Sequence, residues 1–338
     1  MIRTVLLAAA SLLICTVPAI AQDAAEPAAN QPAVAAPASH IEIHTNPLLS
    51  LHMMARAGAA GVEVPATVWP ASQAMTAAGP DMRWEVFDAH FATTTSAEGS
   101  RELLIAMAPR LGERAGGQVG EHVFAYANAF ADAAPKFHAE VWPEHKVRID
   151  AASEGLKAAL DAHGPSCIAR ICEILGIADP RVTTPTFLVT VAPAPGGFSV
   201  LSREYYALSI VSIDAHQGSA LVEATLHEAI HVLDAHTRQQ QPPSVLASLR
   251  KALTDAGIQP TDPRFRDIPH TLIFAVAAHI TRTSVDASHI PYGQTGGYYA
   301  KVPEARDAVL PSFTRYVAGE ISSAGLVAEI VKNSTKPE

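Results

Sequence analysis

The sequence predicts an α+β protein with a mainly helical N-terminal half, a small antiparallel sheet and at least two further helices. Three observations lead to this prediction. Residues 46–175 hold Ala-rich segments whose apolar residues recur at helical spacing. Runs of β-branched and aromatic residues, separated by Pro and Gly, follow position 180. The pentapeptide His-Glu-Ala-Ile-His at 227–231 lies within a strongly helical pattern directly after these runs.

The N-terminal half is expected to consist of several helices. The first begins at Pro47, and longer ones cover 120–134 and 144–162, with breaks at Pro135, Pro143 and Gly164-Pro165. We interpret the scattered histidines of this half as surface or packing residues; they are His52, His122, His138, His145 and His163.

The C-terminal half is expected to open with three strands, at 186–191, 198–201 and 205–213, with a Pro/Gly turn at 193–197. A helix over 219–235 follows them and contains the pentapeptide. Beyond a loop at 239–243, further helices are predicted at 246–256, 269–286 and 304–318. A Gly/Tyr-rich stretch at 289–299 separates the last two. We divide the chain into a helical region, 40–180, and a C-terminal region, 181–338.

The N-terminus resembles a secretory signal peptide. Arg3 precedes an apolar run at 5–17, and Ala19-Ile20-Ala21 fits a small-x-small cleavage site, so residues 1–21 are expected to be removed. The alternative is a membrane anchor, but the apolar run is short for a span. Residues 22–39 are rich in Ala and Pro and are expected to be disordered. The mature protein is expected to have no membrane span and to be periplasmic or secreted.

Composition excludes some partners. The formal net charge is −9 and there are no basic runs, which argues against nucleic acid and anionic membrane surfaces. Cys167 and Cys172 remain after removal of the signal peptide. In an oxidising compartment they form either one local disulfide or two free buried thiols, and their spacing matches no zinc-ribbon pattern.

The pentapeptide carries the functional prediction. His227 and His231 are four residues apart, so on a helix they share one face and can bind a single Zn²⁺. Glu228 lies about 100° round the helix, within reach of a water molecule at that ion. Glu223 and Asp234 fall on the same face, while the opposite face is apolar.

Catalytic zinc needs a third protein ligand. No glutamate lies between Glu228 and Glu304, and the best candidate is His279, which the small residues Ala275 and Ala278 flank. Glu304, Asp286 and His270 stay open as alternatives, although His270 lies on the opposite side of its helix from His279. Asp234 is expected to orient a ligand imidazole rather than to bind metal.

These motifs resemble the zincin metallopeptidases, and the order strand, HExxH helix, loop and second helix over 186–286 is similar to their glutamate-ligand branch, the gluzincins. In that branch a Gly-Glu pair occupies the place of Ala278-His279, so the resemblance implies that His279 replaces the usual glutamate. It also implies a donor for the oxyanion, for which we choose Tyr292 in the Gly/Tyr-rich stretch.

The sequence therefore predicts an exported zinc-dependent hydrolase, in the first place a peptidase acting on peptide or protein substrates. Metal-activated water would attack the amide bond, with Glu228 as general base. Two alternatives remain. One is a hydrolase of cell-wall amide or ester bonds, and the other is a non-catalytic zinc-binding or scaffolding protein on a decayed peptidase fold.

Overall fold

The computed structural model describes residues 39–335 except 80–81, 83, 116, 179–180, 194–195 and 202–206. It confirms the α+β class, because helices predominate and four strands form one sheet. The predicted signal peptide (1–21) and the Ala/Pro-rich segment up to residue 38 lie outside the described residues. Within the described part, no helix is long and apolar enough to cross a membrane.

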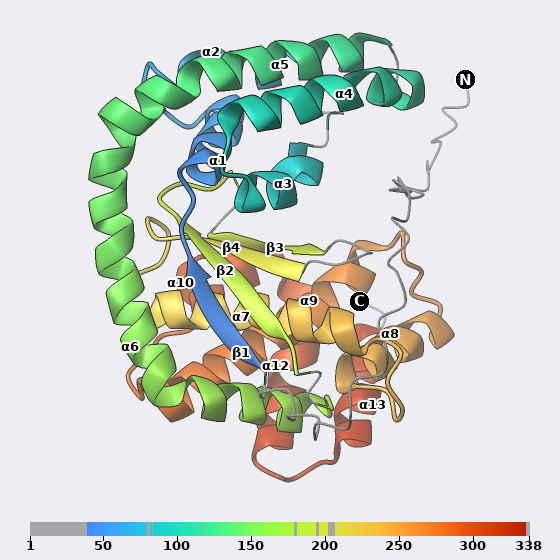
Figure 1. The fold of residues 1–338 in the computed structure, drawn as a ribbon. Coiled ribbons are helices and arrows are strands. Elements are labelled where there is room, and N and C mark those ends of the chain that lie inside the picture. The colour runs from blue at the N-terminus through green and yellow to red at the C-terminus, as the bar shows by residue number, and fades with distance from the viewer. Residues whose placement is uncertain are drawn as a thin grey trace, which may run out of the picture. The chain divides into compact units, whose positions relative to one another are not determined.

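Residues 47–175 are helical almost throughout, as the sequence predicts (Figure 1). The elements are α1 (Pro47–Ala59), α2 (Trp69–Ala77), η1 (Trp84–Phe87), α3 (Asp88–Thr93), α4 (Ala97–Ala115), α5 (Gly117–Lys136), the π-helical turn η2 (Phe137–Val141) and α6 (Trp142–Leu175). Helices α4 and α5 lie side by side, and α5 also packs on α2 and α1.

The predicted helix breaks are wrong. Pro135 lies within α5, the turn η2 connects α5 directly to α6, and α6 continues through Pro165. Pro143 is in the first turn of α6, where its missing N–H group is not needed. A proline inside a helix removes one hydrogen bond, and the packing of buried α6 residues such as Ile168 and Ile171 offsets that loss.

The sheet is mixed, so the predicted antiparallel arrangement is only partly right. Its strands, in spatial order, are β1 (His40–His44), β2 (Thr183–Val189), β4 (Ala207–Ser212) and β3 (Gly197–Leu201). β3 and β4 are antiparallel, but β1–β2 and β2–β4 are parallel. The buried run Phe187, Leu188 and Val189 in β2 is typical of a parallel strand covered on both faces.

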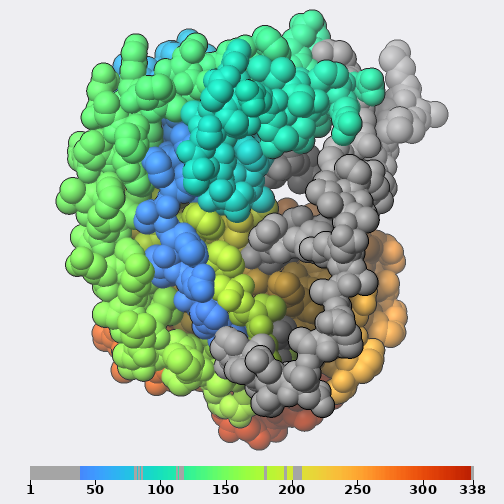
Figure 2. All heavy atoms as spheres, viewed as in Figure 1, coloured from blue at the N-terminus to red at the C-terminus, as the bar shows by residue number. Residues whose placement is uncertain are grey.

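Strand β1 was not predicted, and it forms one edge of the sheet. Helix α6 packs against it, and Figure 2 shows β1 in blue directly beside the green atoms of α6. This packing shields one of the two edges of the sheet, and β3 forms the other edge. Helix α7 packs against β4, β3 and β2.

The C-terminal half continues with helices. They are α7 (Ser219–Thr237), α8 (Val245–Asp255), α9 (Pro263–Ile280), the π-helical turn η3 (Thr281–Val285), α10 (Tyr292–Thr295), α11 (Tyr298–Lys301), α12 (Pro303–Val317) and α13 (Ser323–Ser334). α7 confirms the predicted helix, whereas α13 was not predicted. α9 packs against α7 on one side and against α12 on another.

Helix α9 begins at Pro263 rather than at the predicted Pro269. The side chain of Asp262 caps it, accepting a hydrogen bond from the backbone N–H of Arg264 at 2.9 Å. Pro263 then occupies the first turn, the helical position that proline tolerates best. Helix α9 carries both His270 and His279, the two histidines considered as a third metal ligand.

Cys167 and Cys172 are buried on α6, and no disulfide joins them. The alternative of a local disulfide is therefore wrong, and the alternative of two buried thiols is confirmed. Residues five apart on a helix point about 140° from each other, so the two sulfur atoms diverge.

A buried polar network ties α1 to α3 and α5. His52 is fully buried, with Nδ1 2.6 Å from the Tyr126 hydroxyl and Nε2 3.0 Å from Asp88 Oδ1. Arg56 donates to both carboxylate oxygens of Asp88, at 2.7 and 2.5 Å. Burial lowers the pKa of His52 although Asp88 opposes this effect. His52 is thus a packing histidine, as interpreted from the sequence.

Asp88→Ala is expected to lower the free energy of unfolding by about 3–5 kcal/mol, because it leaves the charge of Arg56 partly buried without a partner. The matched control is Asp150→Ala, which removes the exposed pair with Lys146 and is expected to change stability by less than about 1 kcal/mol. Urea unfolding measures both variants. Equal effects of the two substitutions would contradict a structural role for the network.

Candidate metal centre

Helix α7 places His227 and His231 on successive turns of one face. The helix starts after Gly218, whose φ of 54° lets the chain turn sharply out of the loop that follows β4. Its apolar residues Leu226 and Ile230 are fully buried. The two imidazole Nε2 atoms lie 3.2 Å apart.

A third histidine joins this pair from α9. His270 Nε2 lies 3.0 Å from His227 Nε2, and the nearest ring nitrogens of His227, His231 and His270 all lie within 4.8 Å of one another. His227 is buried and the other two are partly buried. The three imidazoles therefore converge on one point between α7 and α9.

The prediction that His279 faces the histidine pair is wrong. His279 lies nine residues after His270, so the two side chains point to nearly opposite sides of α9. The face with His270 packs against α7, while His279 contacts Phe313 of α12, with ring centroids 5.9 Å apart. Ala278 and His279 both line a cavity between α9 and α12, on the side of α9 away from α7.

The other candidates also lie elsewhere. Glu304 is exposed in the first turn of α12, and Asp286 accepts hydrogen bonds from the backbone and side chain of Ser288. Asp234 does not orient an imidazole as predicted. Its carboxylate instead accepts two hydrogen bonds from Arg250, at 2.7 and 3.1 Å.

The three imidazoles fit a divalent cation. Four nitrogen or oxygen ligands at about 2.0–2.1 Å from zinc lie about 3.4 Å apart in a tetrahedral site, close to the observed 3.0 and 3.2 Å. Burial lowers the pKa of His231 to about 3 and that of His270 to about 4, and it also holds the pKa of His227 well below its ordinary value. The rings are therefore neutral at pH 7.

Three neutral imidazoles cannot satisfy one another. Each ring has one donor and one acceptor nitrogen, and here the three Nε2 atoms face the same point. His227 Nε2 lies within hydrogen-bond distance of both neighbours, but one N–H group can serve only one of them well. A cation that accepts a lone pair from each of the three Nε2 atoms resolves this conflict. The group is therefore a good candidate for a metal site.

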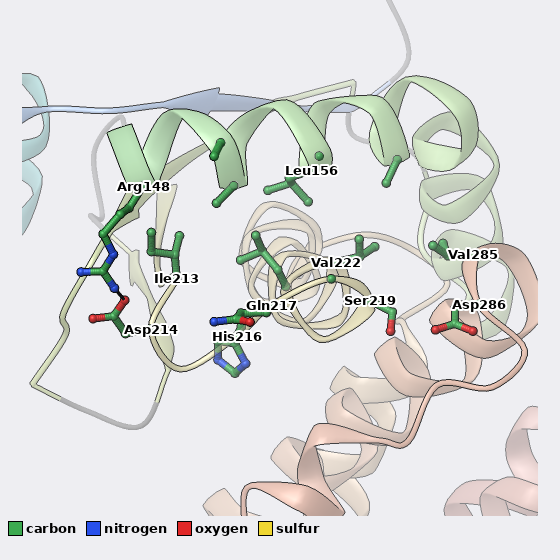
Figure 3. Close-up of a pocket in the computed structure, with 16 residues that line it drawn as sticks. Arg148, Leu156, Ile213, Asp214, His216, Gln217, Ser219, Val222, Val285 and Asp286 are labelled. Atoms are coloured by element: carbon green, nitrogen blue, oxygen red, sulfur yellow. Dashed lines mark hydrogen bonds and ion pairs between the residues drawn. The ribbon is translucent and has the colours of Figure 1, made fainter. Parts of the chain in front are cut away.

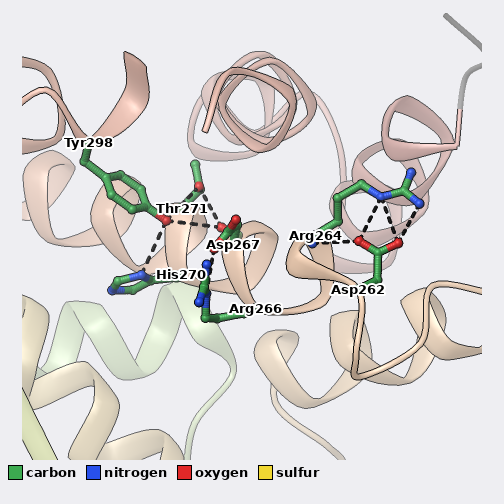
Figure 4. A network of polar contacts seen from close by, with 7 residues as sticks. All are labelled: Asp262, Arg264, Arg266, Asp267, His270, Thr271 and Tyr298. Carbon is green, nitrogen blue, oxygen red and sulfur yellow. Dashed lines mark hydrogen bonds and ion pairs between the residues drawn. The ribbon is translucent and has the colours of Figure 1, made fainter. Parts of the chain in front are cut away.

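Tyr298 holds His270 from the far side of its ring. The tyrosine hydroxyl lies 3.4 Å from His270 Nδ1 and 3.4 Å from the backbone carbonyl of Asp267 (Figure 4). Asp267 in turn pairs with Arg266. A partner on Nδ1 fixes the ring orientation and leaves Nε2 directed at the other histidines.

Glu228 lies beside the histidines and is buried. Its Oε2 accepts a hydrogen bond of 2.6 Å from the hydroxyl of Ser199 on β3. Burial raises the pKa of Glu228 to about 7, although the Ser199 hydrogen bond opposes the rise. A carboxyl group with a pKa near neutrality can both accept and return a proton.

Glu223 connects α7 to the segment that carries Tyr292. Its Oε2 accepts hydrogen bonds from the backbone N–H of Tyr292, at 2.8 Å, and from His289 Nε2. His289 Nδ1 lies 3.0 Å from the Ser219 hydroxyl, so this segment is attached to α7 at two points. Residues of the Gly/Tyr-rich stretch therefore line the same cavity as His227 and His270.

A cavity of about 500 Å³ opens above the centre. The cavity is lined by charged and polar residues, aromatic residues and glycines. The lining residues are Gly197, His216, Glu223, Ala224, His227, Glu228, Arg266, Asp267, His270, Phe274, Tyr292, Gly296, Tyr298, Lys301 and Val302. A small molecule or a short peptide segment fits such a volume.

His216 separates this cavity from a second one. Its buried ring meets the ring of Tyr292 edge-on, with centroids 4.3 Å apart, and it hydrogen bonds to the backbone of Gly196. On its other side lies a cavity of about 680 Å³, which is closed at one end by the Arg148–Asp214 pair (Figure 3). Burial lowers the pKa of His216 to about 4.

Sequence reasoning missed several of these residues. His216 and Ser199 lie in no recognisable motif, and Tyr298 lies in the Gly/Tyr-rich stretch, from which only Tyr292 was chosen. These residues join the site through contacts between separate elements. The helical pattern did place Glu223 on the same face as His227, but its hydrogen bonds to the 289–292 segment depend on the tertiary structure.

Comparisons with protein-family models, curated proteins and solved structures find no match to this chain.

His270→Ala is expected to weaken zinc binding at least about a hundredfold, because two imidazoles remain where three converge. His279→Ala is the matched control, since it removes a histidine from the opposite side of the same helix, and it is expected to leave zinc affinity unchanged. Competition with a chromophoric chelator measures both. Loss of affinity in the His279 variant alone would restore the ligand set predicted from the sequence.

Gly196→Ala is expected to destabilise the protein more than Gly61→Ala. Both glycines have φ near 90°, but an added Cβ at Gly196 would lie 2.0 Å from His216 Nε2, whereas none of the described atoms lies within 4 Å at Gly61. Backbone strain alone costs about 1–2 kcal/mol, and the clash adds about 1–3 kcal/mol. Urea unfolding compares the two, and equal losses would show that His216 moves freely.

Proposed function

We propose that this chain is a zinc-dependent hydrolase, and in the first place a peptidase. One observation carries the proposal. Three neutral imidazoles converge beside a buried carboxylate, Glu228, at the base of a cavity of about 500 Å³. When bound, zinc supplies a Lewis acid that polarises a carbonyl group and makes water more acidic.

The residues of this chain divide the remaining work. His227, His231 and His270 hold the metal, and Tyr298 fixes the orientation of His270. Glu228 accepts a proton from the attacking water and returns it to the leaving amine, because its buried carboxylate lies beside the three histidines at the base of the cavity. Ser199 keeps the carboxylate of Glu228 in place.

Tyr292 is our candidate for binding the oxyanion. Glu223 fixes the Tyr292 backbone, and the ring of His216 packs against the tyrosine ring, so the phenol is held at the wall of the cavity. A donor fixed before the reaction stabilises developing charge without further reorganisation.

Two features support the choice of an amide bond as the substrate. One is the resemblance of the HExxH sequence motif to that of zincin peptidases, and the other is the position of strand β3. The antiparallel edge strand β3 carries Gly197 and Ser199 next to Glu228, and an added Cβ at Gly197 would lie 3.4 Å from Glu228 Oε1. An edge strand beside a catalytic carboxylate offers backbone groups to which an extended peptide can pair.

Glu228→Gln is expected to retain stoichiometric zinc and to lower peptide hydrolysis at least about a hundredfold, because the amide cannot accept the proton of water. Glu154→Gln, an exposed substitution on α6, is the control and is expected to change neither quantity. Metal analysis and a library of fluorogenic peptides, assayed with zinc-loaded protein, measure both.

Each outcome of this assay is informative. Normal turnover by the Glu228 variant would show that Glu228 is not the base. Chelator-sensitive cleavage of ester or cell-wall amide probes without peptide cleavage would favour a hydrolase of another bond. Stoichiometric zinc without any turnover would favour the non-catalytic alternative.

A further inference from the structure

A third cavity lies on the side of α9 that faces away from the metal centre. Its volume is about 860 Å³, and α9, η3, α10, α11 and α12 all contribute to its wall. His279, the residue that the sequence favoured as a zinc ligand, lines this cavity instead. The volume is within the range of small-molecule sites.

The charged groups of this cavity are all basic. Arg282 and Arg306 line it together with His279, and no carboxylate lies among its described lining residues. Burial lowers the pKa of His279, and the neighbouring Arg170 and Arg282 lower it further. This concentration of positive charge contrasts with the net charge of −9 of the whole chain.

Neither arginine is fully neutralised by the protein. Arg282 makes no ion pair with any of the described residues. Arg306 uses Nε for its pair with Asp307, whose side chain is 68% exposed and does not line the cavity. Guanidinium groups bind carboxylates and phosphates through paired hydrogen bonds, so two of them in one cavity indicate an anion.

The cavity also has apolar lining residues. Leu310, Phe313 and Val317 come from α12, and Ala275 and Ala278 come from α9. The small alanines leave room between the two helices, and the buried ring of Phe313 forms part of the wall. A bare inorganic ion would leave this wall without a partner.

We propose that this cavity binds a small amphipathic anion, a carboxylate or phosphate ester attached to an apolar body. Arg282 and Arg306 bind the anionic group, and Leu310, Phe313 and Val317 contact the apolar body. The site is separate from the histidine centre and does not depend on hydrolase activity.

Calorimetric titration of the purified protein tests the proposal, with octanoate and octyl phosphate as probes. Saturable binding of at least one probe is expected, with acetate, inorganic phosphate and octanol each binding at least about tenfold more weakly. The stronger of the two octyl probes identifies the anionic group. Absence of saturable binding by both octyl probes would overturn the proposal.

Paired variants locate the binding site. Arg282→Ala with Arg306→Ala is expected to weaken octyl-anion binding at least about tenfold, whereas Arg110→Ala, an exposed arginine on α4, is expected to have no effect. Circular dichroism checks that each variant is folded, and Arg282→Lys provides a milder second substitution that is expected to weaken binding by a smaller factor.

The His270→Ala variant separates this site from the metal centre, since its octyl-anion binding is expected to be unchanged. Binding lost in the His270 variant but kept in the arginine variants would place the anion at the histidines and overturn the proposal.

Discussion

The contact between α7 and α9 determines the chemistry available to this protein. Helix α7 carries two imidazoles on one face. The side of α9 that packs against α7 determines that His270, and not His279, joins them. The three ring nitrogens that face one point cannot all find a donor among themselves, so this contact offers a place for a shared cation. The geometry of this contact therefore makes His227, His231 and His270 a candidate metal site.

Helix α7 organises the rest of the centre as well. One helix carries two of the three imidazoles, the buried carboxylate of Glu228 and the carboxylate of Glu223 that fixes the 289–292 segment. The sheet holds this helix from one side, and β3 supplies the Ser199 hydroxyl to Glu228. The two imidazoles and both carboxylates are therefore positioned by a single rigid element, which is what accurate placement of reacting groups requires.

The sequence predicted what depends on local spacing. The bounds of α7, the helical character of 47–175 and the strands β2 to β4 follow from periodicity within single segments. The start of α9 was not predicted correctly. Both the capping residue Asp262 followed by Pro263 and the later Pro269 are possible start signals, and the sequence alone does not decide between them. The parallel pairing of β1 with β2 also escaped prediction, since it joins residues far apart in the chain.

The choice between His270 and His279 illustrates the same limit. Both lie on one helix with similar apolar neighbours, and the spacing shows only that they point in opposite directions. Small residues next to His279 suggested a close contact with α7, but Ala275 and Ala278 leave space for a cavity beside α12 instead. Small residues permit either a close contact or an open cavity, and only the tertiary structure distinguishes the two.

Diffraction at the zinc absorption edge from crystals of the zinc-loaded protein tests the central claim most directly. The account predicts one anomalous peak about 2.0–2.1 Å from the Nε2 atoms of His227, His231 and His270. A peak bound by His279, or the absence of any peak between the three imidazoles at saturating zinc, would contradict it.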